Sequence, residues 1–68
     1  MLKWRDAKTD PPRPGKRVIA RCYGFTGEGY TDHNGRWMRG YDMPWKEVFD
    51  QDVLEWTEMP ETLRPDVP

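Results

Sequence analysis

The sequence predicts a single small, mainly β domain of the α+β type. Two runs that alternate apolar and polar residues, 17–23 and 52–58, are typical of half-buried strands. Between them, Asn34-Gly35 joins two further β-prone runs, which is a strong signal for a hairpin. We therefore expect a four-stranded antiparallel meander with one short helix. Either the helix and Trp4 cover one face of the sheet, or the sheet curls into a small barrel.

An isolated tryptophan, Trp4, and a proline-rich segment precede the first strand. Pro11, Pro12 and Pro14 exclude a helix and favour an extended connector that ends in a turn at Pro14-Gly15. We expect this connector to carry Trp4 across the sheet and to tie the N-terminus to the core.

The first strand is predicted over residues 16–23. Val18, Ala20 and Cys22 alternate onto one side of it, and we expect this side to face the core because all three side chains are small and apolar. Residues 24–27 then connect this strand to the hairpin.

The hairpin strands are predicted near residues 27–32 and 35–40, and two turn geometries are open. A two-residue type I′ turn would place Trp37 opposite Asp32, whereas a type I turn with a glycine bulge pairs Thr31 with Trp37. We favour the second geometry because an aspartate suits the first position of a type I turn. It also lays the Trp37 indole over Gly29.

A short helix is predicted near residues 44–50. Trp45, Val48 and Phe49 fall at i, i+3 and i+4 and form one apolar face, and Asp42 is expected to cap the N-terminus of the helix. A helix of this length is marginal alone, so it must dock on the sheet.

The last strand covers residues 52–58, in which Leu54 and Trp56 point to the same side. We expect one domain over 1–61 and an extended tail over 62–68. The predicted core contains Trp37, Trp45 and Trp56, with Trp4 as a fourth candidate.

Charge is distributed unevenly along the chain. Residues 1–21 carry seven Lys or Arg against two Asp, a net charge of +5, whereas residues 42–68 carry eight acids against two basic residues, a net charge of −6. Two interpretations follow. The ends neutralise each other across the folded sheet, or they form a bipolar surface that steers a charged partner.

The residues that usually carry chemistry are scarce. The chain has one cysteine, one histidine and no serine, so it offers no internal disulfide and no serine nucleophile. Cys22 lies within a predicted strand and His33 in a turn, where they are not expected to meet. We therefore expect no catalytic residue, no metal, no cofactor and no enzymatic activity. We also expect no membrane segment and a cytoplasmic location.

Several fragments, taken in order, resemble a family of short bacterial and phage proteins catalogued as domain of unknown function 551. The fragments are Trp4, Asp10-Pro11-Pro12-Arg13-Pro14-Gly15-Lys16-Arg17-Val18-Ile19-Ala20, Gly29-Tyr30, Gly35-Arg36-Trp37 and Val53-Leu54-Glu55-Trp56-Thr57-Glu58-Met59-Pro60-Glu61. Leu54-Glu55 stands where members often have Thr-His. The resemblance covers residues 4–61 and implies a compact β-rich fold and a phage or prophage setting, without an assigned activity.

Three functions remain open. The first is a protein-interaction module, because four Trp, three Tyr and two Phe exceed what so small a core can hide. The candidate interaction surface is formed by aromatic residues expected to stay partly exposed, with two arginines: Tyr23, Phe25, Tyr41, Trp45, Arg21 and Arg39. The partner is expected to be a protein, and the oligomeric state is left open.

The second function is a nucleic-acid-binding module that uses the basic N-terminal arm and the aromatic residues of the sheet. Trp4 is interleaved with basic residues, and Arg17, Arg21, Arg36 and Arg39 lie on predicted strands, as in stacking platforms for single strands. The acidic C-terminal third argues against it. The third function is a small-ligand binder with an aromatic pocket.

Overall fold

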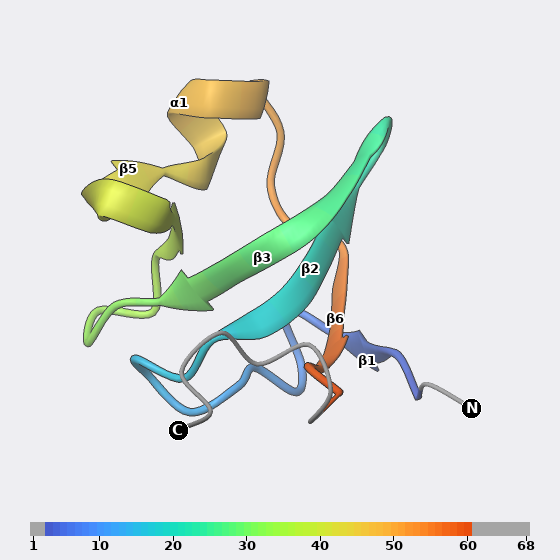
Figure 1. Cartoon of the computed structure of the whole chain (residues 1–68). Helices are drawn as coiled ribbons and strands as arrows, with labels where there is room; N and C mark the ends of the chain where they lie inside the picture. The colour runs from blue at the N-terminus through green and yellow to red at the C-terminus, as the bar shows by residue number, and fades with distance from the viewer. Residues whose placement is uncertain (1–2, 61–68) are drawn as a thin grey trace.

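The computed structural model describes residues 3–60, apart from the side chain of Tyr41. Their strands form one open sheet in which every pairing is antiparallel (Figure 1). In chain order, the six strands are β1 (Arg5–Asp6), β2 (Val18–Cys22), β3 (Phe25–Thr31), β4 (Trp37–Arg39), β5 (Met43–Pro44) and β6 (Glu55–Glu58). Their order across the sheet is β1-β6-β2-β3-β4-β5. The predicted mainly β class is confirmed, and the sheet does not close into a barrel.

The predicted number of strands is too low. Strands β1 and β5 are each two residues long, too short to show alternation in the sequence. The meander holds for β2, β3 and β4, but β6 then returns to pair with the free side of β2 and lies between β1 and β2. Both edges of the sheet are therefore very short strands, and one of them contains Pro44.

The first hairpin joins β2 to β3 through only two residues, Tyr23 and Gly24. Cys22 pairs with Phe25, and Gly24 has a φ of +83°, which glycine adopts without steric cost. The predicted connection over 24–27 was too long, because Phe25 already belongs to the strand. The alternation of β2 is confirmed: Val18, Ala20 and Cys22 are buried.

The second hairpin has the favoured register, with Thr31 opposite Trp37. Gly35 has a φ of +83°, and its N–H donates to the Asp32 carbonyl oxygen at 2.9 Å. The Asp32 carboxylate also accepts the backbone N–H groups of Asn34 and Arg36. The Asp32 side chain therefore provides the hydrogen-bond acceptor for two backbone N–H groups of the turn, as expected for an aspartate at the first position of a turn.

The helix α1 spans Trp45–Phe49 and begins directly after Pro44, without a side-chain cap. The expected cap at Asp42 is wrong. A 3₁₀ turn, η1 (Gly40–Asp42), and strand β5 precede the helix, and Asp42 instead accepts a hydrogen bond from the Tyr30 hydroxyl at 2.8 Å. The apolar face is also narrower than predicted, because Val48 is 42% exposed.

The core lies between the inner face of the sheet, α1 and the segments that flank β1 and β6. Its buried hydrophobic residues are Ala7, Val18, Ala20, Cys22, Trp45, Val53 and Trp56, with Phe25, Trp37 and Phe49 packed against them. Trp45 and Trp56 thus occupy the core as predicted, and Trp37 borders it. Leu54, expected on the same side as Trp56, is 42% exposed because β6 starts only at Glu55.

Trp4 does not join this core. Its ring lies 3.9 Å from the guanidinium carbon of Arg21, which alternates onto the outer face of β2. The proline-rich connector is held instead by Trp56, whose Nε1 donates to the Asp10 carbonyl oxygen at 2.7 Å. The predicted turn at Pro14-Gly15 is confirmed, with Gly15 at a φ of +82°.

Gly29, rather than lying under Trp37 as expected, lies under Trp45. A Cβ added there would be 3.1 Å from Trp45 Cζ3 and 3.2 Å from the Met38 carbonyl oxygen, neither of which can easily move. We expect Gly29→Ala to reduce the free energy of unfolding by about 1–3 kcal/mol through overpacking. Urea unfolding followed by tryptophan fluorescence measures this change.

The matched control is Gly40→Ala, because a Cβ at Gly40 meets nothing within 4 Å. Its effect should stay within about 0.5 kcal/mol. Equal stability of the two variants would contradict the close packing of Trp45 on β3.

The turn carboxylates predict a pH dependence of stability. The backbone N–H of Arg36 lowers the pKa of Asp32, and the backbone N–H groups of Thr9 and Lys8 lower the pKa of Asp6. Each contribution is therefore present above the unfolded pKa of roughly 3.9 and is lost as the pH falls through the folded pKa.

Asp32→Asn keeps an oxygen acceptor but cannot titrate. We expect it to be less stable than the wild type at neutral pH, with the difference shrinking as the pH falls below about 3.9. Asp6→Asn should behave in the same way. Thermal unfolding at a series of pH values tests this, and parallel curves for wild type and variants would rule it out.

Candidate functional site

Three of the six candidate residues meet in one cluster on the α1 side of the sheet. Phe25 stacks on Phe49 with ring centroids 4.4 Å apart and meets Trp45 edge-on at 5.7 Å. The guanidinium carbon of Arg39 lies 4.8 Å from the Phe25 centroid and 5.7 Å from the Phe49 centroid. We call Phe25, Arg39, Trp45 and Phe49 the aromatic–arginine cluster.

The local sequence explains why these residues meet. Phe25 opens β3 and Arg39 ends β4, and strand alternation points both to the inner face. Trp45 and Phe49 are i and i+4 on α1 and therefore share one side of it. Phe49 was not among the predicted surface residues, although its spacing from Trp45 was a usable signal.

Arg39 is held in place by more than the rings. Its Nη1 donates to the Glu28 carbonyl oxygen at 3.1 Å, which fixes the plane of the guanidinium. A cation over aromatic faces is stabilised by their quadrupoles, more so when it is partly desolvated. The cluster is therefore held together by contacts within the domain.

Trp45 was expected to stay partly exposed, and this prediction is wrong. The residue is 1% exposed and cannot contribute to a surface. Its Nε1 is buried and has no hydrogen-bond partner among residues 3–60. An unsatisfied buried donor of this kind costs roughly 1–3 kcal/mol. Trp45 thus lies beneath Phe25 and Phe49 and contacts both rings.

Tyr23 is 77% exposed and occupies the tip of the β2–β3 hairpin. Its backbone is fixed by the side-chain amide of Gln51. This amide accepts the Tyr23 N–H and donates to the Tyr23 carbonyl oxygen, both at 2.9 Å. The exposed ring therefore stands on a turn that is tied to the segment after α1.

Of the remaining two candidates, Arg21 does not join the cluster, and Tyr41 cannot be placed relative to it. Arg21 lies on the opposite face of the sheet, where its Nε donates to Glu55 Oε1 at 2.7 Å and its guanidinium covers Trp4. Tyr41 belongs to η1, and its side chain lies outside the described part of the structure. The predicted surface is therefore split between two faces.

Two ion pairs join the basic N-terminal third to the acidic C-terminal third. Lys16 Nζ lies 2.6 Å from Glu58 Oε1, and Arg21 pairs with Glu55 across β2 and β6. Pairs this exposed contribute little to stability. They act instead on the electrostatic potential of the surface, because each ion pair neutralises one positive charge.

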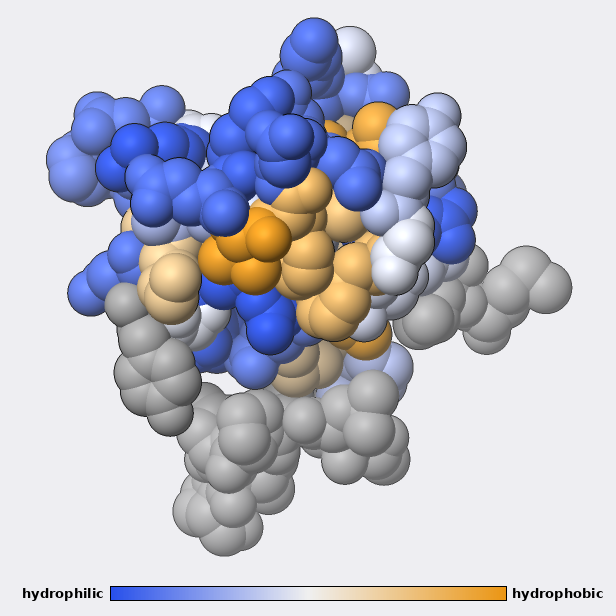
Figure 2. All heavy atoms as spheres, turned by 90° about the horizontal axis from the view of Figure 1, so that it is seen from above, coloured by the Kyte–Doolittle hydropathy of each residue, from blue (hydrophilic) through white to orange (hydrophobic). Residues whose placement is uncertain are grey.

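The side of the molecule that carries α1 is apolar at its centre. Figure 2 looks down on α1 and shows hydrophobic residues gathered in the middle of this side, with hydrophilic residues around them. Val48 is 42% exposed, and Phe25 and Phe49 are half-buried. We define Phe25, Arg39, Val48 and Phe49 as the α1 face.

His33 is exposed in the β3–β4 turn, and the Cys22 thiol is buried within the core. Among residues 3–60, no three His, Cys, Asp or Glu side chains are placed so that they could hold a metal ion together. Within the same residues, no helix has the length and apolar character needed to cross a membrane.

Comparison with protein-family models, with curated proteins and with solved structures finds no match to this chain. The family resemblance of the sequence therefore stays a prediction, and the functional argument rests on the geometry of the chain itself.

The stacked position of Arg39 can be tested directly. We expect Arg39→Lys to reduce the free energy of unfolding by about 1–2 kcal/mol, because lysine lacks the planar group that covers the rings and bonds the Glu28 carbonyl. Arg36→Lys is the control, since Arg36 is exposed and its pairing with Asp32, at 3.8 Å, should be worth under about 0.5 kcal/mol. Equal losses in the two variants would show that the stacking contributes nothing.

Proposed function

We propose that this chain is a small accessory protein of the phage or prophage type that acts by binding another protein through the α1 face. The observation that carries the proposal is the combination of apolar and cationic side chains on that face. Phe25 and Phe49 stack there, Arg39 lies over both rings, and the exposed Val48 belongs to the same helix as Phe49.

The composition of the α1 face suits a protein partner. Aromatic and arginine residues are enriched at the centres of interfaces, where truncation costs the most binding energy. The ring positions are set by a strand and a docked helix, so binding would order few additional side chains. Tyr23 adds a large exposed ring at the hairpin tip that could extend the contact.

The proposal assigns no reaction to the chain. Cys22 is buried and His33 lies at an exposed turn, so a thiol–imidazole pair has no support from the geometry. We also place the protein in the cytoplasm, where a free thiol such as that of Cys22 stays reduced.

Nucleic-acid binding has less support, because arginines on which it would depend are engaged within the domain. Arg17 Nη1 lies 3.2 Å from Glu28 Oε2, Arg21 pairs with Glu55, and Arg39 lies on the aromatic rings. Binding of single strands relies on free cations beside accessible rings, and it weakens steeply with salt.

The test uses Val48→Arg, which places a charge on the α1 face at an already exposed position. Proteins that the wild type captures from a host lysate should be lost, and a purified partner should bind at least about tenfold more weakly, as for loss of an interface anchor. Thr26→Arg is the control, because Thr26 is exposed on the outer face of the sheet. Retention of the same partner by all three proteins would reject the α1 face.

A further inference from the structure

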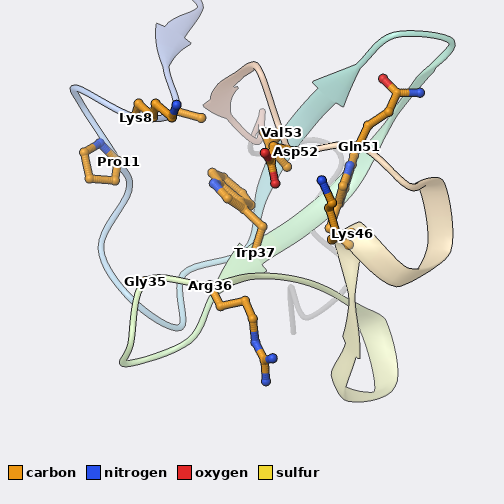
Figure 3. A pocket seen from close by; sticks show the side chains of 11 residues that line it. Lys8, Pro11, Gly35, Arg36, Trp37, Lys46, Gln51, Asp52 and Val53 are labelled. Atoms are coloured by element: carbon orange, nitrogen blue, oxygen red, sulfur yellow. The ribbon is translucent and has the colours of Figure 1, made fainter.

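A groove of about 410 Å³ lies on another part of the molecule, between the N-terminal connector, the β3–β4 turn and the segment that joins α1 to β6 (Figure 3). This volume falls within the range of small-ligand sites, roughly 300–1,000 Å³. Of the aromatic–arginine cluster, only Trp45 lines the groove. The groove and the α1 face are therefore separate surfaces.

The groove has an apolar interior. Trp37, Val53, Pro11 and Ala7 line it, and Figure 3 shows the Trp37 indole standing among the lining residues. Trp37 is half-buried, so part of its ring remains accessible. A flat apolar ligand could pack against this ring, because offset stacking of aromatic groups is favourable.

Positive charge flanks the groove on two sides. Lys8 stands on the connector and Lys46 on α1, and neither forms an ion pair with a residue in the described range 3–60. Arg36 also lines the groove, but it pairs with Asp32, and Figure 3 shows it pointing away. Asp52 is the one carboxylate among the lining residues. The charges that line the groove therefore favour a ligand with an anionic group.

We propose that this groove binds a small aromatic carboxylate. The aromatic ring packs against Trp37, and the carboxylate lies between Lys8 and Lys46. The same chemistry is available from a free aromatic acid and from the C-terminal aromatic residue of a peptide. The site does not depend on the proposed protein-binding function.

The test is a titration of the full chain, labelled with ¹⁵N, with indole-3-carboxylate. The chain has four tryptophans and therefore four indole N–H signals, which Trp→Phe variants assign. We expect the signals of Trp37 and Trp45 to shift saturably and those of Trp4 and Trp56 to stay in place. Titration to about 10 mM detects a Kd of the order of 1 mM.

Charge and position are tested by matched probes and variants. Indole-3-carboxamide, which is neutral, and the variant Lys46→Gln should each weaken binding about tenfold, because a charge-assisted contact is lost. Lys3→Gln makes the same charge change outside the groove and should leave the Kd unchanged. Comparing the acid with the peptide Gly-Gly-Trp, with a free and an amidated C-terminus, assigns the source of the carboxylate.

The proposal is overturned by any of three results: no saturable shift, equal shifts of all four indole signals, or equal binding of the carboxylate and the carboxamide. A loss that is the same for Lys46→Gln and Lys3→Gln would also reject it, because binding would then follow net charge alone. Each variant changes an exposed lysine, so its fold is expected to be retained.

Discussion

The docking of one indole on one glycine is the constraint on which the rest of this small structure depends. Gly29 has no side chain, and the Trp45 ring fills the space that a Cβ would need. A helix of five residues is too short to persist alone, so α1 exists because this contact anchors its first residue to β3. The stack of Phe25 on Phe49 and one wall of the groove both follow from that anchor.

The parts of the fold that could be predicted are those set by nearby residues, through the alternation of apolar side chains or through the residues of a turn. The small apolar residues of β2 alternate onto the core, and the aspartate and glycine of the second turn fix the pairing of Thr31 with Trp37. The errors arise where pairing is decided by distant segments. The position of β6 beside β2, and the existence of β1 and β5, leave no periodic signal in strands so short.

The candidate site was predictable in composition but not in arrangement. Phe25 and Arg39 lie together on the inner side of the sheet, yet Trp45 lies beneath them, and Arg21 lies on the opposite side of the sheet. Alternation along a strand separates Arg21 from the inner face, and this could have been read from the pattern of β2. The depth of Trp45 could not, because it depends on which glycine the ring meets.

The two short edge strands of the sheet, its rims, limit the pairing of this sheet with another strand. With β1 and β5 only two residues long, and Pro44 in one of them, few backbone groups are left to template the addition of another strand. A contact made at these rims would therefore depend on side chains, so single substitutions could change it while the backbone stays the same.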